Sequence, residues 1–404
     1  MVLDTKKEKF CVKQSIIEKE LAVQVSEDII IPDTKPDIIS AVNSCGNVCV
    51  YKKDILDGKI RLDGSINVYV MYIPDAENNC VHSINSNLDF TELIDIEQAR
   101  QGMNSTEKIT IKSIECKVLN GRKVNISVLL NIKTKLYTND EINIIGEVTN
   151  CPDAQFLNKS TNVITLIGSG SNKLYAKENL KIDEIDNLME VLKVNFNIVN
   201  AETKISYNKV LIKADLYVNV LYLTDDNRIN CVKSTIPIMG FIDIQNVNED
   251  NVCNVDYTIQ NILIKQNSVE EHSIYVEVQL EAICMAYKLE QVNIIQDLYS
   301  PKYNINFTSK RLNVVSNKRT LKNECQINET LNIPELGNGR LYNVDITPNI
   351  LSANLANGKI IYNGDIELNF LFEANNVINF DSRSLRVEFN SIVDIRRFSF
   401  KFKY

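Results

Sequence analysis

Histidine is the first side chain to consider for acid–base chemistry, because its pKa lies near neutral pH. The chain has two, His82 and His272, far apart in the sequence and not at corresponding places. The chain repeats internally, and neither histidine has a counterpart in another copy of the repeat. An active centre needs its groups within reach of one another. The sequence therefore predicts two exposed loop histidines and no acid–base site.

Other patterns that could hold a phosphate or a cation are weak. The glycine-rich segment 167–172 lacks the lysine and the following helix of a phosphate loop, which predicts a β-turn instead. The acidic pairs Asp225-Asp226 and Glu270-Glu271 fall at predicted hairpin tips, where solvated turns explain them and weak calcium contacts are the alternative. We therefore expect no enzyme activity, no cofactor and no metal.

The cysteines need separate consideration, because ten are many for a chain expected to fold in the cytosol. Cys45 and Cys49 lack the second pair or the histidine that would complete a zinc site. Cys80 and Cys231 occupy matching places in two copies of an internal repeat. Two interpretations stay open: small buried or half-exposed thiols, or exposed thiols that crosslink neighbouring molecules in an oxidising compartment.

The overall composition is that of a globular protein. Of the 404 residues, 44% are hydrophobic and 24% are charged, and the net charge of −8 argues against binding to nucleic acid or to an anionic membrane. No apolar run approaches the roughly 20 residues that cross a bilayer. The first ten residues mix lysines with acids and lack the apolar run of a signal peptide, so we expect synthesis in the cytosol.

An internal repeat organises the chain, with three copies spaced by about 150 residues. Segments 57–75 and 207–225 align without a gap, and 357–372 aligns with them as the third copy. We predict three domains: a first repeat over 1–150, a second over 151–300, and a truncated third over 301–404 that ends in an aromatic strand.

Alternation of apolar and polar residues predicts the strands that carry these side chains. Residues 59–73 alternate over a long stretch, directly after a tight-turn signal at Asp57-Gly58. Residues 109–118 and 124–133 form a second such pair around Asn120-Gly121, which is a strong hairpin signal. Each copy is therefore predicted to contain antiparallel sheets.

One short helix in each copy is also predicted. Asp183 is a suitable N-cap for a helix that ends near Leu192, and Pro36 suits the first position of a helix over 36–42. Two glycines within 334–339 disfavour a full helix in the third copy. The predicted fold class is mainly β, with tandem antiparallel β-sandwich-like domains, each with one short helix.

Several of these blocks resemble the SPOCS domain of clostridial spore-envelope proteins, the domain carried by SipL. The resemblance begins with Pro32-Asp33-Thr34-Lys35-Pro36-Asp37-Ile38 and extends over nearly the whole chain. The blocks that follow in the family's order are 56–59, 70–73, 90–96, 102–103 and 119–124.

The resemblance implies a non-catalytic protein that is made in the mother cell of a sporulating bacterium and deposited on the spore envelope. SipL-like members end in a LysM module that engages the coat-basement ATPase. The sequence up to Tyr404 contains no such module, so we do not expect that partnership from these residues.

The last residues depart from the repeat, because aromatic and polar residues alternate there. The aromatic residues are Phe398, Phe400, Phe402 and Tyr404. One possibility is that this tail closes a smaller sheet and the protein simply ends. The other is that an open edge of the third repeat accepts a strand from another molecule, with Phe10 and Val12 in the candidate donor strand.

Two functional classes remain. The first is a structural protein of the spore coat, exosporium or appendage that self-assembles with other copies or other envelope proteins. The alternative is a non-catalytic adaptor that binds a spore morphogenetic protein during coat assembly. Self-assembly predicts strand pairing between chains and crosslinks through Cys80 and Cys231, whereas an adaptor predicts a monomer with an exposed apolar patch on one repeat.

Overall fold

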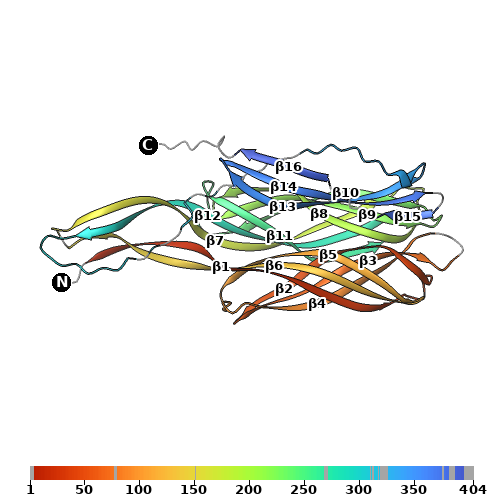
Figure 1. Cartoon of the computed structure of the whole chain (residues 1–404), viewed down its shortest axis with the longest axis horizontal. Coiled ribbons are helices and arrows are strands. Elements are labelled where there is room, and N and C mark those ends of the chain that lie inside the picture. Colours follow the sequence, from red (N-terminus) through yellow and green to blue (C-terminus); the bar gives the residue numbers. More distant parts are fainter. Residues whose placement is uncertain are drawn as a thin grey trace.

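The computed structural model shows an elongated molecule built almost entirely of strands, with a thick stacked body and a narrower extension (Figure 1). It describes residues 4–76, 80–150, 152–267, 272–309, 311, 314–316, 318, 326–374, 377–381 and 387–394. Every strand pair in the described part of the chain is antiparallel. The predicted mainly β fold class is confirmed.

The first unit consists of two three-stranded sheets. One sheet has the strand order β1-β6-β5 and the other has the order β2-β3-β4. Its strands are β1 (Thr5–Ile30), β2 (Ile38–Leu56), β3 (Lys59–Pro74), β4 (His82–Asp95), β5 (Asn104–Asn120) and β6 (Lys123–Val148).

The two sheets of the first unit face each other across one apolar core. Alternate residues of the two central strands, β3 and β6, point into this core and are buried. Among them are Ile60, Leu62, Ile66, Val68, Val70 and Tyr72 from β3, and Val124, Ile126, Val128, Leu130 and Ile132 from β6. Two sheets that interdigitate through their inner faces form a β-sandwich, as predicted.

The second unit repeats this arrangement, with the strand orders β11-β12-β7 and β10-β9-β8. Alternate residues of β9 and β12 fill its core. Its strands are β7 (Gln155–Lys181), β8 (Leu188–Ser206), β9 (Lys209–Thr224), β10 (Ile229–Asp243), β11 (Val252–Gln266) and β12 (Ser273–Tyr299). The limits of the three predicted domains stay a prediction.

The third unit has a single sheet in the described part of the chain. Its central strand β14 pairs with β13 on one side and with β15 and β16 on the other. Its elements are the 3-10 helix η2 (Pro334–Leu336) and the strands β13 (Arg340–Ala356), β14 (Lys359–Ala374), β15 (Val377–Asp381) and β16 (Val387–Asp394). This sheet corresponds to β2-β3-β4 of the first unit, so one half of a sandwich is described here.

The predicted tight turns are confirmed. Gly58 has a φ of 79° and Gly358 a φ of 72°, and Asn208 takes the same left-handed conformation at 59°. Glycine and asparagine adopt positive φ at low cost, so each repeat can place its central strand directly after a two-residue turn.

The predicted helices over 36–42 and from Asp183 to Leu192 are wrong. Residues 183–187 form a turn in which Asp183 accepts a hydrogen bond from the backbone of Asp186 (2.9 Å), and strand β8 begins at Leu188. The segment 36–42 is likewise not helical, because β2 begins at Ile38, whose backbone N–H donates a hydrogen bond to the Gly121 carbonyl (2.9 Å). Pairing with a neighbouring strand outweighs a helical pattern of this length.

The prediction of a β-turn at 167–172 is also wrong, because this segment lies within strand β7. A Cβ atom on Gly170 would lie 2.7 Å from a methyl carbon of Ile242 and 2.9 Å from the Asp243 carbonyl oxygen. The glycine therefore allows β10 to pass close to β7. No helix in the described part of the chain is long and apolar enough to cross a membrane.

Two long two-stranded antiparallel ribbons form the extension in Figure 1. The first part of β1 pairs there with the last part of β6, and β7 pairs with β12 in the same way. The chain after β12 returns along this extension, where Ile164 of β7 donates a backbone hydrogen bond to the Val315 carbonyl (2.7 Å). The N-terminal strand is thus paired over its whole described length.

We predict that Gly64→Ala destabilises the first unit. An added Cβ would lie 2.4 Å from the Cys49 carbonyl oxygen and 2.5 Å from the Phe90 ring, so strands would have to move apart. We expect urea denaturation to show a loss of about 1–3 kcal/mol in the free energy of unfolding. The control is Gly146→Ala, where the added atom meets only the mobile Glu8 side chain at 3.1 Å. Equal effects of both changes would contradict this reading.

Candidate functional site

The described residues contain no group of three or more His, Cys, Asp or Glu side chains that could hold a metal ion. Asp225 and Asp226 lie in a turn, as predicted. Asp226 accepts a hydrogen bond from Arg228 (2.6 Å), which explains why an acidic side chain suits this turn without a cation. Glu270 and Glu271 lie outside the described residues.

A polar cluster joins the first unit to the second. Glu190 of β8 forms an ion pair with Lys35 and accepts a hydrogen bond from the backbone N–H of Ser83 (3.1 Å). Its second carboxylate oxygen lies 2.9 Å from Nδ1 of His82, and Nε2 of that ring lies 3.5 Å from the Cys80 sulfur. A thiol, an imidazole and a carboxylate from two units therefore lie in a row.

This order of groups occurs in sites that activate a thiol, but the pKa shifts here favour another role. Burial raises the pKa of the Cys80 thiol, which disfavours the reactive thiolate. Burial alone would raise the pKa of the Glu190 carboxyl. The hydrogen bond from His82 and the charge of Lys35 outweigh burial, so the pKa of Glu190 lies below its ordinary value. The ionised carboxylate thus links the two units.

Sequence reasoning placed both histidines in exposed loops, and this was wrong for His82. That residue is the first of strand β4 and is buried, with 6% of its surface exposed. His272 lies in the loop before β12, as predicted, but it is half-buried, and its Nδ1 is 3.0 Å from the Asp186 carbonyl oxygen. No local signal identifies the His82 contact, because Glu190 comes from another repeat.

A second polar cluster joins the second unit to the third. Lys193 of β8 is buried and forms an ion pair with Asp345 of β13. Asn195 donates a hydrogen bond to the same carboxylate (2.8 Å), and Asn219 donates one to Asn343 (3.2 Å). A buried charge is tolerated only with well-placed partners, so this cluster specifies how the two sheets lie on each other.

An apolar cluster lies where all three units meet. It takes two residues from the first unit, four from the second and one from the third: Met71, Val81, Leu192, Leu221, Leu223, Ile229 and Leu371. Each is at most 2% exposed. The three units are therefore packed into one stack, in which β13, β14 and β16 form an outer layer (Figure 1).

The side of the third sheet that points away from the second unit is apolar and partly uncovered. We call it the open face. It comprises residues of β13 and β14 that alternate with those contacting the second unit: Ile346, Ile350, Leu355, Ile360, Tyr362, Ile366 and Leu368. On β13 the exposed fractions are 63% for Ile346, 65% for Ile350 and 73% for Leu355. An apolar surface of this kind marks a candidate protein contact.

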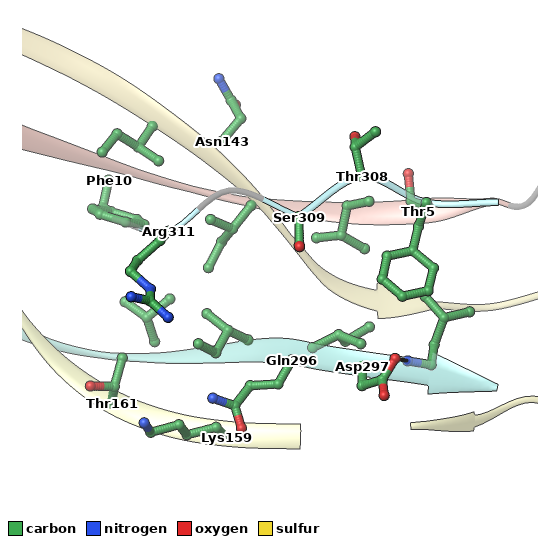
Figure 2. A pocket seen from close by; sticks show the side chains of 18 of the residues that line it. Thr5, Phe10, Asn143, Lys159, Thr161, Gln296, Asp297, Thr308, Ser309 and Arg311 are labelled. Atoms are coloured by element: carbon green, nitrogen blue, oxygen red, sulfur yellow. Dashed lines mark hydrogen bonds between the residues drawn. The ribbon is translucent and has the colours of Figure 1, made fainter. Parts of the chain in front are cut away.

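The predicted donor strand is not free. Phe10 is buried in an apolar cluster with Val163 and Val292, and Val12 packs against this cluster. An open groove of about 1670 Å³ lies between the two ribbons. Figure 2 shows Phe10 and Arg311 among the residues that line it, with Arg311 extending from the returning chain. Strand donation through these residues would require β1 to leave β6. The predicted tail residues Phe398, Phe400, Phe402 and Tyr404 lie outside the described residues.

The two cysteines at matching repeat positions have different environments. Cys231 on β10 is exposed, whereas Cys80 is buried beside His82. Of the two interpretations left open by the sequence, an exposed thiol fits Cys231 and a buried thiol fits Cys80. Cys45 is half-buried at the contact with the second unit, and burial raises the pKa of its thiol to about 11.

The chain was compared with known proteins. Residues 37–119 and 187–267 match the family model described as SipL, SPOCS domain. The first match spans the sheet of β2, β3 and β4 together with β5, and the second spans the sheet of β8, β9 and β10 together with β11. No match was found among curated proteins or among solved structures.

We predict that the ionic contact at Glu190 makes stability depend on acid pH. Because the folded-state pKa of Glu190 is lowered, its contribution is fully present above the ordinary carboxyl value of 4.5 and is lost as the pH falls through the lowered value. Glu190→Gln should cost about 1–3 kcal/mol at neutral pH and flatten this acid dependence. Thermal unfolding followed by circular dichroism tests this.

The matched control is Glu184→Gln, which changes an exposed carboxylate in the loop before β8. This change should leave both the stability at neutral pH and the loss of stability at acid pH close to those of the unmodified chain. An acid dependence that is unchanged in Glu190→Gln would show that the carboxylate does not hold the junction.

We also predict unequal reactivity of the two matching thiols. In the native protein, iodoacetamide should modify Cys231 at least about tenfold faster than Cys80, because Cys80 is buried and its thiol pKa is raised. Peptide mass spectrometry at timed intervals measures both rates in one sample. In urea the two rates should converge, and equal rates in the native protein would contradict the burial of Cys80.

Proposed function

We propose that this chain, which carries SPOCS-domain sequence in its first two units, is a structural protein of the bacterial spore envelope that acts by self-assembly. The family match supports an association with spores. The coat, the exosporium and an appendage are the envelope structures to which such a protein could contribute. In this proposal the chain is made in the mother-cell cytoplasm and deposited on the spore without catalysing a reaction.

The observation that carries the proposal is the open face of the third sheet. In the first two units the corresponding face is covered by a second sheet, whereas here Ile346, Ile350 and Leu355 are largely exposed. Exposed apolar surface is stabilised when another protein covers it. The ionic and apolar junctions between units favour a rigid building block rather than a flexible string.

The environments of the possible chemical groups support a non-catalytic role. The row formed by Cys80, His82 and Glu190 is buried and holds two units together, and the raised thiol pKa opposes nucleophilic chemistry. Among the cysteines that the structure describes, Cys231 is the exposed one and is suited to a crosslink between neighbouring molecules. A crosslink of this kind would reinforce an assembly that apolar contacts have already formed.

An adaptor for a spore morphogenetic protein is the second candidate. It is favoured by the fact that the exposed apolar face lies on one of the three units. An adaptor would keep this face for a different protein and would be monomeric alone. The two functions therefore differ in what the purified chain does by itself.

Negative-stain electron microscopy of the purified chain, with and without reductant, tests the proposal. We expect ordered filaments or sheets, with Cys231→Ser lowering their resistance to detergent in the absence of reductant and Cys80→Ser leaving it unchanged. Uniform monomers at every protein concentration would contradict self-assembly and support the adaptor. Light scattering on the same samples gives the mass of the particles.

A further inference from the structure

We propose that the open face packs against the same face of a second copy, so that two half-sandwiches complete one sandwich between molecules. This rests on the proposed self-assembly and specifies one of its contacts, because a twofold contact closes at a dimer and a filament or sheet needs a second contact between dimers. The contact relates the two copies by a twofold axis, because each supplies the same patch. The assembling unit is then a dimer joined through its third units.

The internal repeats show what covers this face in the same chain. The open-face residues Ile360, Ile366 and Leu368 correspond to Ile60, Ile66 and Val68 of β3, counted from the shared turn before each strand. Those three residues of the first unit are at most 1% exposed, because the sheet β1-β6-β5 lies on them. In β9 the corresponding Val210, Leu216 and Val218 are fully buried by the sheet of β7, β11 and β12. A β-sheet is thus the established cover of this face.

Within the third unit, the described chain covers only one end of the face. Leu331, Ile333 and Leu336 pack against Phe370 and Phe372, near the end of β14. Toward the turn that joins β13 to β14, Ile350 and Leu355 of β13 are exposed, and Ile360 and Ile366 of β14 are half-buried. Sheet-on-sheet packing places two such faces about 10 Å apart.

The other side of the third sheet is already in use. Asp345 forms an ion pair with Lys193, and Leu371 is buried in the cluster shared by all three units. The open face is therefore the side of the third sheet that is left for a partner in the described part of the chain. A partner placed there extends the stack outward without disturbing its interior.

The chemistry of the open face favours a second copy as the partner. The chain carries a net charge of −8, so two copies have an overall electrostatic repulsion to which an uncharged contact surface does not add. Cross-strand partners on this face are apolar pairs such as Ile346 with Leu368 and Leu355 with Ile360, and none of its seven defining residues is charged. Two identical uncharged faces can therefore meet without like-charge contacts, as a twofold interface requires.

Neighbouring residues on opposite sides of β13 allow a matched test in the full chain. Ile346→Lys places a charge in the proposed interface, whereas Thr347→Lys places the same charge on the other side, opposite Glu367. Sedimentation equilibrium should show Ile346→Lys raising the dimer dissociation constant at least about tenfold, with Thr347→Lys close to the unmodified chain. Circular dichroism and thermal unfolding verify that both variants are folded.

A photo-crosslinking residue in place of Ile350 identifies the partner directly. Crosslinks to residues of β13 or β14 in a second copy are expected. Crosslinks to another surface of a second copy, or to residues 395–404 of the same molecule, would overturn the inference. This readout remains valid even if Ile346→Lys lowers stability.

The outcomes separate this inference from the proposed function. If the unmodified chain assembles and Ile346→Lys assembles equally well, self-assembly stands and the open face is not its interface. If the unmodified chain is monomeric in sedimentation and in electron microscopy, both are overturned, and a different protein covers the face.

Discussion

The structure depends on one constraint: a β-sheet with an apolar face must bury that face. Alternate residues of β3 and β9 form apolar faces, and strands that precede and follow them in the chain form the second sheet that covers each face. Burial of these faces supplies the main stabilisation of each unit. The third sheet carries the same alternation, but in the described part of the chain it lacks this cover. The interaction proposals for this protein arise from that difference.

The outer sides of the same sheets decide how the units are arranged. They present a mixture of polar and apolar side chains instead of a fully charged surface, so one sheet can lie on the next unit. Glu190 and Lys193 are close in sequence on β8, yet one pairs with Lys35 of the first unit and the other with Asp345 of the third. Strand β8 therefore connects both junctions. Tandem copies become a stack because each junction buries an apolar cluster beside a paired charge.

Reasoning from sequence recovered the strands, the hairpin turns and the SPOCS resemblance well, because these features repeat and have a short period. It failed where long-range pairing overrides local pattern. Asp183 looked like a helix cap but begins a turn, and the glycines near 170 looked like a turn but lie in a strand beside β10. The candidate site was foreseen only in general terms, as an incomplete third repeat, since neither the open face nor the His82 contact has a local signature.

The sequence by itself determined the alternation, the turn residues and the number of repeated copies, since each depends on neighbouring residues or on a fixed spacing. Only the tertiary structure decided which faces are covered and which remain open, because exposure depends on strands that are distant in the chain. It also decided that Cys80 is buried while Cys231 is exposed, although both occupy matching places in the repeat. The physical reason is that the first unit packs its Cys80 region against the second, while Cys231 lies on an exposed strand position.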